Sequence, residues 1–451
     1  MPDEDERARL DDAREVRRPT ATSARSAGSG SLIFVNAAQV VTCAGPPRAR
    51  RGREMKELEV LPGAAVVTRG ELIEAVGEQR ELRRRYPAAT EVDCQGGVLT
   101  PGLVDSHTHA LFGRARYEEQ ELRAAGMDYM EIARLGGGIH ASVADLRSRD
   151  EHELLELAIP RLRRLGSFGI TTVEVKSGYA LTLDDELKAL RTIKTLAQTL
   201  PMRIVATFLG AHEIPLEHRG SPDARTEYVD LLVEGMIPRV ASERLARFAD
   251  VFCETGVYTV AESRRILQAA RGHGLLLKLH ADELTSFGGA ELAAELGATS
   301  ADHLAAISNE GIRALATSPT VATLLPGTML FLGKAARAPA RELINAGVPV
   351  ALATDFNPGT SPTPNLPLVL TLGVSQLSLS AAESLMAATV NGAAALALAG
   401  RIGQLARGFF ADLALFGIQD VRELPYWYGD RRCLGTWVRG KTCHPLHLGV
   451  T

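Results

Sequence analysis

The chain has 451 residues, more than one ordinary domain needs and enough for a barrel of about 250 residues with a smaller second domain. Hydrophobic residues make up 45% of it and charged residues 23%, as in an average soluble globular protein. The net charge of −4 provides no basic field to hold a phosphate backbone, so we exclude nucleic acid as a partner.

The cysteines and the apolar segments of the sequence indicate the cellular compartment. The five cysteines are widely spaced, form no Cys-x-x-Cys pair and are odd in number, which favours a reduced, cytoplasmic protein. The first 18 residues are highly charged and lack the apolar stretch of a secretory signal. No apolar run of 18 residues appears elsewhere, so we expect no membrane span and no membrane partner.

The first hundred residues and the last fifty predict one small domain. Residues 1–30 are charged and then rich in Ser, Ala and Gly, which predicts a flexible tail. Short strand-like runs follow within 31–100, interrupted by a basic insert between Gly45 and Glu57 that we expect to be a solvated loop. Short strands return in 400–451, so we expect both chain ends to form one composite β domain.

Residues 101–399 alternate short apolar strands with longer helical segments, the pattern of repeated βα units around a parallel sheet. Eight such units predict an α/β fold with a closed (β/α)8 TIM-type barrel, whose active site lies at the carboxyl ends of the strands. The eight expected strands lie within 102–109, 169–178, 202–212, 248–256, 274–283, 298–304, 320–327 and 348–357.

Histidines and an aspartate stand at the ends of several of these strands. His107 and His109 are two residues apart, so they share one face of the first strand; on their own they could equally be surface histidines. His280, His303 and Asp355 end the fifth, sixth and eighth strands, although a lone His280 is more often a core residue and Asp355 could serve a turn. Barrel closure would bring all five together, which favours a metal site.

This pattern of His-x-His on strand one, His on strands five and six, and Asp on strand eight resembles the amidohydrolase superfamily over residues 31–451. The resemblance implies a metal-dependent hydrolase. Imidazole and carboxylate ligands suit either zinc or iron, and we expect a single divalent ion held by four of these residues, His107, His109, His280 and Asp355.

Many members of the superfamily bridge two metals with a lysine on strand four. Strand four of this chain ends in Cys253-Glu254, which supports the single-metal expectation. Lys176 follows strand two and is assigned a structural or rim position.

Five longer strings, at 131–143, 173–188, 208–220, 278–304 and 355–367, resemble the imidazolonepropionase family. The family opens the ring of 4-imidazolone-5-propanoate to N-formimidoyl-L-glutamate in histidine degradation, and the resemblance implies a homodimer. The chain departs from the family in its N-terminal tail, in the basic insert and at Ser106, where the family often has Cys.

The substrate carries a propanoate, which calls for a cation. Arg116, on the loop after His109, can bind a carboxylate in bidentate fashion, although the residue alone could be an ordinary rim arginine. Tyr179 and His212 follow strands two and three and can hydrogen-bond the ring or the carboxylate. Tyr129 is similar to a pocket residue of the family but lies in a helical stretch, where an aromatic side chain usually belongs to the core.

The loop after Asp355 is a second candidate for binding the carboxylate. Asn357, Gly359 and Thr360 offer an amide, a backbone N–H and a hydroxyl, either around the substrate or within a plain turn.

In the expected reaction, the metal activates a water that attacks the ring carbonyl. Asp355 accepts the proton of the water, and His303 acts as a catalytic residue that positions the water or stabilises the oxyanion. Glu283, three residues after His280, moves the proton to the ring nitrogen, and Asp282 points elsewhere.

Two other functions stay open. The metal-ligand spacing alone also allows another amidohydrolase, such as a deaminase or a cyclic amidase acting on a related heterocycle. Arg116 together with the Asn357 loop argues against it, since a neutral base needs no carboxylate-binding elements. A non-catalytic scaffold with the same barrel need not keep its ligands, whereas this chain has all of them.

Overall fold

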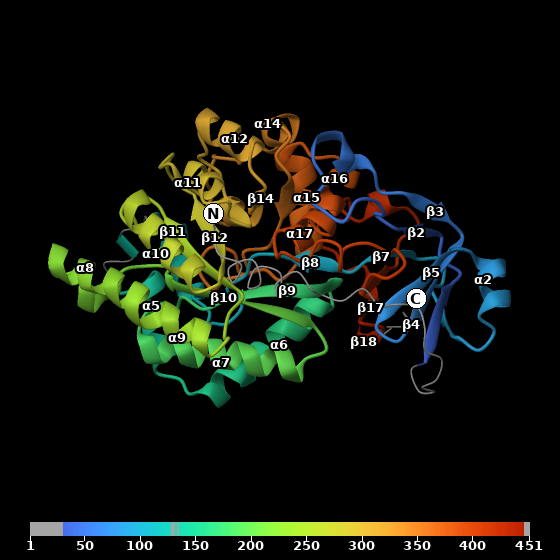
Figure 1. Ribbon diagram of the computed structural model, residues 1–451, viewed down its shortest axis with the longest axis horizontal. Helices are drawn as coiled ribbons and strands as arrows, with labels where there is room; N and C mark the ends of the chain where they lie inside the picture. Colours follow the sequence, from blue (N-terminus) through green and yellow to red (C-terminus); the bar gives the residue numbers. More distant parts are fainter. Residues whose placement is uncertain (1–29, 128–130, 133–134, 446–451) are drawn as a thin grey trace, which may run out of the picture. The chain divides into compact units, whose positions relative to one another are not determined.

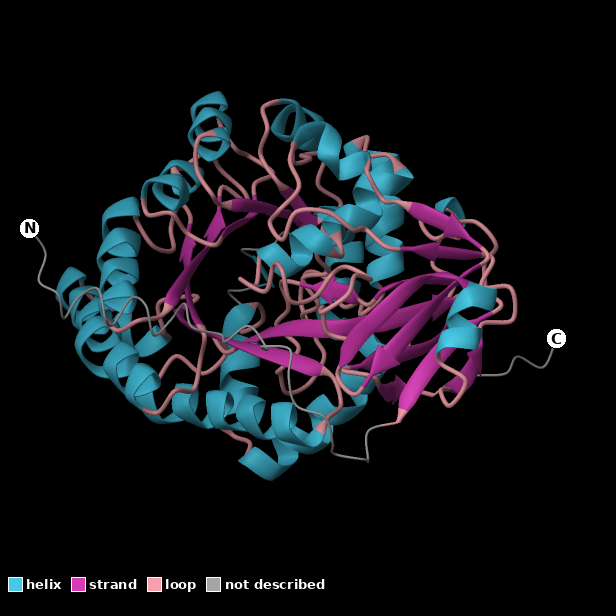
Figure 2. Cartoon of the chain, turned by 45° about the vertical axis from the view of Figure 1, so that its right-hand side comes forward, coloured by secondary structure: helices cyan, strands magenta, loops and turns pink. Residues whose placement is uncertain are grey.

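A computed structural model describes residues 30–127, 131–132 and 135–445 of the chain. The predicted N-terminal tail therefore lies outside the described residues, apart from its last position. Eight parallel strands form a sheet in chain order, with a ring of helices around it (Figures 1 and 2). These strands are β8 (Leu103–Asp105), β9 (Ile170–Lys176), β10 (Arg203–Ala211), β11 (Phe248–Cys253), β12 (Leu276–Ala281), β13 (Ser300–His303), β14 (Val321–Leu324) and β15 (Val350–Leu352).

Each observed strand falls within one of the eight expected segments, and the α/β barrel prediction is confirmed. The first and last strands meet through the residues that follow them. Asp355 N donates to His107 O at 3.0 Å, and His109 N donates to Phe356 O at 2.9 Å. The segments that close the barrel are therefore the same segments that carry three of the predicted metal ligands.

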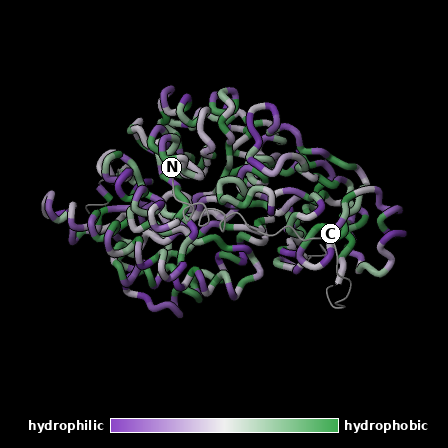
Figure 3. Tube along the Cα trace, in the orientation of Figure 1, coloured by the Kyte–Doolittle hydropathy of each residue, from purple (hydrophilic) through white to green (hydrophobic). Residues whose placement is uncertain are grey.

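Helices cover the outer face of the barrel. Several begin at capping residues, such as Thr182, whose hydroxyl accepts the N–H of Asp185, and Thr259 with its capping box to Glu262. In Figure 3 many outward turns of these helices are hydrophilic, as expected for a solvent-facing layer. The helices of this layer are α5 (Ile139–Arg147), α6 (Glu151–Gly166), α7 (Leu183–Thr199), α8 (Pro222–Asp230), α9 (Ile237–Ser242), α10 (Val260–Gly272), α11 (Gly289–Glu295), α12 (Asn309–Ala316), α13 (Pro326–Phe331), α14 (Ala340–Asn345), α15 (Leu366–Leu377), α16 (Ala381–Ala387) and α17 (Val390–Ala394).

The two ends of the chain contribute to a shared six-stranded sheet of order β18-β17-β16-β7-β2-β3, and a second sheet has the order β5-β4-β1-β6. The ring of Phe34 meets that of Trp437 edge to face at 4.8 Å, which joins the cores of the two ends. The strands are β1 (Ser31–Val35), β2 (Gln39–Val41), β3 (Val60–Pro62), β4 (Ala64–Arg69), β5 (Leu72–Glu78), β6 (Thr90–Asp93), β7 (Val98–Pro101), β16 (Leu413–Phe416), β17 (Cys433–Val438) and β18 (Lys441–His444).

A composite β region from both chain ends is thus present, as predicted. Strand β7 pairs with β16 and leads directly into barrel strand β8. The exact boundaries of the β domain, at 31–100 and 400–451, and of the barrel, at 101–399, remain a prediction. Among the helices that the structure describes, none is long and apolar enough to cross a membrane.

The expectation that the basic insert is a solvated loop is wrong for its centre. Arg50 is only 2% exposed, and its backbone N–H donates to Asn391 Oδ1 at 2.7 Å. The guanidinium of Arg51 donates to Gly347 O at 3.1 Å and to Ser318 O at 2.6 Å. Arg50 is buried and Arg51 is partly buried because acceptors distant in sequence receive N–H groups of both, an amide oxygen for Arg50 and carbonyl oxygens for Arg51. A charge pattern cannot reveal such acceptors.

Candidate metal centre

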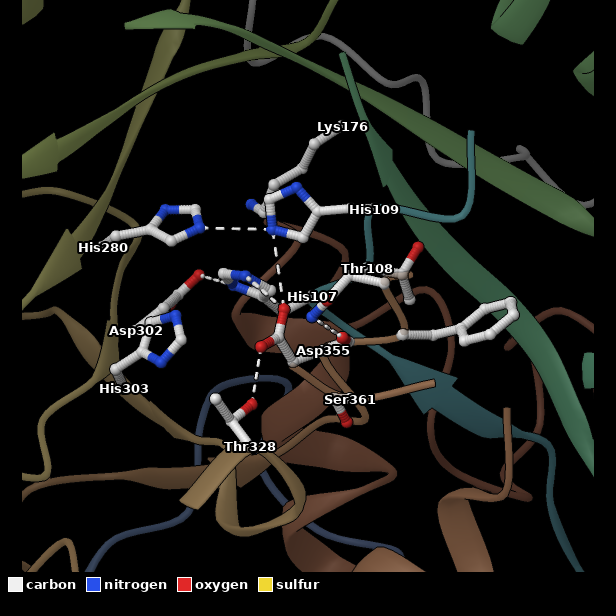
Figure 4. Close-up of polar contacts among 12 residues, drawn as sticks. His107, Thr108, His109, Lys176, His280, Asp302, His303, Thr328, Asp355 and Ser361 are labelled. Carbon is white, nitrogen blue, oxygen red and sulfur yellow. Dashed lines mark hydrogen bonds and ion pairs between the residues drawn. The ribbon is translucent and has the colours of Figure 1, made fainter. Parts of the chain in front are cut away.

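Four histidines and one aspartate meet at the carboxyl end of the barrel strands. His107 and His109 follow β8, His280 lies in β12, His303 ends β13 and Asp355 follows β15. All five side chains are buried, with at most 4% of their surface exposed. Figure 4 shows their polar groups turned toward one another. The structure therefore brings together all four predicted metal ligands and the predicted catalytic histidine.

The distances between the donor atoms suit a metal shell. Nε2 of His109 lies 3.3 Å from Nε2 of His280, and Oδ1 of Asp355 lies 3.6 Å from Nε2 of His107 and 3.5 Å from Nε2 of His109. A tetrahedral shell with bonds of about 2.0–2.1 Å places neighbouring donor atoms about 3.3–3.4 Å apart. Nε2 of His107 has no hydrogen-bond partner among the described residues. The donor set therefore fits a divalent ion.

Two overlapping sets of three residues have donor atoms within 4.8 Å of one another. One is His107, His109 and His280, and the other is His107, His303 and Asp355. His303 thus lies close enough to share the cluster, although the sequence assigned it to catalysis and not to metal binding. Its assignment remains a prediction.

The protonation states also favour metal binding. Burial lowers the pKa of His107, His109 and His303 well below the usual value of 6.5, and the nearby charge of Lys176 lowers it further. Neutral imidazoles are the form that ligates a metal. Burial raises the pKa of Asp355 to about 6, against the hydrogen bond from Thr328 Oγ1 to its Oδ2 at 2.6 Å. A cation held in the cluster would favour the ionised carboxylate.

Glu283 lies beside this cluster, on the loop after β12. Its Oε2 lies 3.6 Å from Nε2 of His303. Burial, together with the charges of Asp355 and Glu254, raises the pKa of Glu283 to about 8, so the side chain holds a proton at neutral pH. Asp282 instead accepts the backbone N–H groups at the start of α11, including that of Phe287 at 2.8 Å. Glu283 is therefore the carboxyl group of this loop that can exchange a proton with the cluster.

Tyr179 and His212 border the cluster on another side. The ring of His212 stacks on that of His109 at 4.9 Å, and the ring of Tyr179 lies 5.4 Å from that of His212. His212 Nδ1 is 2.9 Å from the carbonyl oxygen of Gly178 and must donate to it, which leaves Nε2 as an acceptor. Burial lowers the pKa of His212 to about 3, so the ring is neutral. Both residues can thus hydrogen-bond a ring bound at the cluster.

Arg116 is buried against the loop after Asp355. Its Nε and Nη2 each donate to the carboxylate of Glu119 at 2.8 Å. A Cβ at Gly359 would lie 2.6 Å from the guanidinium, so only glycine allows this close approach. Glu119 thus holds the orientation of Arg116. The predicted contact of Arg116 with a substrate carboxylate stays a prediction.

Asn357, Gly359 and Thr360 form a closed turn. The backbone N–H groups of Gly359 and Thr360 donate to Asn357 Oδ1 at 2.9 and 2.7 Å, and Asn357 Nδ2 donates to Asp355 O at 2.6 Å. The donors that the sequence assigned to a substrate carboxylate are therefore used inside the turn, which fixes the segment after Asp355. Tyr129, the remaining predicted contact, lies outside the described residues.

Sequence reasoning missed a group of charged residues within the barrel, beneath the cluster. Lys176 was assigned a structural or rim position after strand two, but it is the last residue of β9 and is fully buried. Although burial opposes its charge, the carboxylates of Asp250 and Glu174 raise the pKa of Lys176 above the usual value. The signal was present in the sequence as charged residues within otherwise apolar strands, two of them at alternate positions of β9. The whole group is Glu174, Lys176, Asp250, Lys278 and Asp302.

Comparisons with known proteins agree with the barrel and its cluster. A model of the amidohydrolase family matches residues 131–444, and a model of the bacterial imidazolonepropionase-like composite domain matches residues 64–89. The adenosine deaminase of Xanthomonas campestris, solved with bound zinc, superimposes with a TM-score of 0.68 at 20% identity over 93% of this chain and 95% of that one. The chain therefore belongs to the amidohydrolase family and has the fold of that solved structure.

The more specific resemblance rests on sequence. The imidazolonepropionase of Symbiobacterium thermophilum is 48% identical over 402 residues, which cover 88% of this chain and 93% of that protein. The imidazolonepropionase of Chloroflexus aggregans is 46% identical over 407 residues, 88% of this chain and 95% of that protein. The chain belongs to the imidazolonepropionase family, as the sequence motifs predicted.

Proposed function

We propose that the protein hydrolyses 4-imidazolone-5-propanoate to N-formimidoyl-L-glutamate, a step of histidine degradation. The observation that carries this proposal is the buried cluster of His107, His109, His280 and Asp355 in a chain of the imidazolonepropionase family. His107, His109, His280 and Asp355 would hold one divalent ion, zinc or iron, which lowers the pKa of a bound water and so supplies the nucleophile at neutral pH.

Three side chains carry out the proton transfers and stabilise the charge that develops in the reaction. Asp355 takes a proton from the attacking water as its oxygen bonds to the ring carbonyl carbon. His303 stabilises the negative charge that develops on the carbonyl oxygen. Glu283, which is protonated at neutral pH, gives its proton to the ring nitrogen as the carbon–nitrogen bond breaks. The products of this bond cleavage are a new carboxylate and the formimidoyl nitrogen.

Substrate binding falls to the residues around the cluster. Tyr179 and the neutral His212 contact the ring, and Arg116 contacts the propanoate. Tyr129 is proposed as a further contact on the family resemblance alone. The turn of Asn357, Gly359 and Thr360 lies against Arg116 and is proposed as a further contact of the propanoate. This arrangement suits a small anionic heterocycle.

We further propose a homodimer, which the family resemblance supports. We also propose a cytoplasmic location, which the five free cysteines among the described residues support. Sedimentation analysis of the purified protein tests the dimer. A monomer at micromolar concentration would contradict it.

The reaction itself is tested on purified protein whose zinc and iron contents have been measured. We expect consumption of 4-imidazolone-5-propanoate with formation of N-formimidoyl-L-glutamate, loss of activity on chelation and recovery with one metal equivalent. Ammonia release is followed in parallel with related heterocycles. Ammonia release without ring opening would show a deaminase and overturn the proposal.

A further inference from the structure

Two buried aspartates contact the outer nitrogens of two predicted metal ligands. Asp302 Oδ2 lies 2.6 Å from Nδ1 of His107 (Figure 4). Asp250 Oδ2 lies 3.1 Å from Nδ1 of His280, and its Oδ1 accepts the backbone N–H of His280 at 3.2 Å. These carboxylates belong to strands β13 and β11, the two neighbours of β12 in the sheet. Each is therefore held by the barrel and not by a mobile loop.

The contacts determine which nitrogen of each ring faces the cluster. A neutral imidazole carries one N–H, and a carboxylate can only accept it. Asp302, within hydrogen-bond distance of His107, thus favours the tautomer with the proton on Nδ1, which leaves the Nε2 lone pair free to ligate. Asp250 offers an acceptor on the same side of the His280 ring, although its 3.1 Å contact with Nδ1 does not have hydrogen-bond geometry. Nε2 of His107 points toward Asp355, and Nε2 of His280 points toward His109.

Two lysines and a glutamate connect these aspartates. Lys176 Nζ lies 2.7 Å from Asp250 Oδ2 and 2.7 Å from Glu174 Oε1. Lys278 Nζ lies 3.4 Å from Asp302 Oδ2 and 3.8 Å from the same oxygen of Glu174. A continuous chain of charges therefore runs from one histidine partner to the other across the inside of the barrel.

The side chains of this chain of charges are fully buried. Buried ion pairs are a poor source of stability because desolvation offsets their attraction, so stability alone gives little reason for such a group.

We propose that Asp302 and Asp250 are positioning residues that hold His107 and His280 in the metal-binding tautomer, and that Lys176, Glu174 and Lys278 keep both carboxylates in place. The inference rests on the proposed metal centre and deepens it. It adds a requirement for residues that touch neither the metal nor the substrate. Metal affinity, and not only activity, is therefore the quantity that should change.

The test uses the full-length protein and the variant Asp302→Asn. We expect its zinc dissociation constant, measured by competition with a chromophoric chelator, to rise about 10- to 100-fold. The visible spectrum of the cobalt-substituted variant should also change, because His107 no longer binds in the same orientation. Glu383→Gln is the matched control: its side chain is 1% exposed, pairs with Arg341 at 2.8 Å and accepts the N–H of Ser380 at the start of α16. That variant should lose stability but keep both metal readouts.

Wild-type zinc affinity and an unchanged cobalt spectrum in Asp302→Asn, with a stability loss like that of Glu383→Gln, would overturn the proposal. Asp250→Asn provides a second, independent variant at His280. If neither variant folds, the tautomers of His107 and His280 can still be measured on the metal-free wild type labelled with ¹⁵N-histidine. Long-range NMR correlations show which ring nitrogen carries the proton. A proton on Nε2 of His107 or His280 would contradict the inference. The ring-opening assay on the wild type tests the proposed reaction and does not depend on these variants. Its failure would therefore show a wrong reaction, whereas unchanged metal binding in the variants would show a wrong positioning role.

Discussion

Glu283 Oε2 lies 3.6 Å from His303 Nε2, at the ends of neighbouring barrel strands β12 and β13. Burial lowers the pKa of His303 and raises that of Glu283 to about 8, so at neutral pH the imidazole is uncharged and the carboxyl group is protonated. The pair therefore offers a proton donor beside a neutral imidazole, next to the predicted metal ligands. This arrangement suits cleavage of a carbon–nitrogen bond, whose leaving nitrogen needs a proton.

Replacing Glu283 by glutamine should remove that proton without changing the size of the side chain. We expect the Glu283→Gln variant to lose about 10²- to 10⁴-fold in kcat while its metal content stays at the wild-type level. Steady-state kinetics and metal analysis on the same preparation check this. Glu295→Gln, an exposed glutamate on α11, is the control and should behave as the wild type. A metal-loaded Glu283→Gln enzyme with the wild-type rate would remove the proton-transfer assignment.

The same residue predicts a pH dependence of stability. The pKa of Glu283 is raised from 4.5 to about 8 by folding, so the folded metal-free protein binds this proton more tightly than the unfolded chain does. The resulting stabilisation is complete below about pH 4.5 and is lost as the pH rises toward 8. The metal-free wild type loses this stabilisation between pH 5 and 8, whereas Glu283→Gln has no such proton to lose. The melting temperature of the metal-free variant minus that of the metal-free wild type should therefore increase over this pH range. A difference in melting temperature that stays constant over this range would contradict the assignment.

Arg116→Ala should mainly raise KM. Loss of a charge-assisted contact to the propanoate weakens binding, and we expect KM to increase about 10- to 100-fold with a smaller change in kcat. Arg114→Ala on the same loop, with a side chain that is 60% exposed, serves as the control. Because Arg116 also pairs with the buried Glu119, thermal melts must show that the variant is folded at the assay temperature. An unchanged KM in a folded variant would exclude the carboxylate-binding role.

Asn391 is predicted to be essential for stability. Its side chain accepts the N–H of Arg50 and donates to the carbonyl oxygens of Arg50 and Val350, at 2.7, 3.1 and 2.8 Å. Asn391→Ala leaves buried backbone groups without partners, at a cost of about 1–3 kcal/mol each. Urea unfolding should therefore show a loss of at least about 2 kcal/mol. Arg48→Ala, in the exposed part of the same insert, should change the free energy of unfolding little. Equal effects of the two variants would contradict this anchoring role.

Much of the fold could be predicted because barrel strands carry a local signature. Each is a short apolar run that ends in polar residues, and a helix with the 3.6-residue period follows most of them. That the predicted metal ligands would meet could be predicted for the same reason, since parallel strands expose their carboxyl ends on one side. His280 and Asp355 could thus be grouped with His107 although they lie far along the chain. Their position at a strand end is a local property.

The partners of these residues could not be predicted, because they depend on contacts between strands. Asp302 meets His107 across 195 residues, and Lys176 meets Asp250 across 74. A lysine in an apolar strand suggests an exposed position until a carboxylate from another strand is known to neutralise it. The burial of Arg50 also depends on a residue distant in sequence, since Asn391 Oδ1 accepts its backbone N–H. The sequence by itself therefore determined the barrel, the family and which strand ends bring the histidines and Asp355 together. Only the tertiary structure decided which charges are buried and which nitrogens of His107 and His280 face Asp302 and Asp250, because the energy of a buried charge depends on the neighbours that folding places around it.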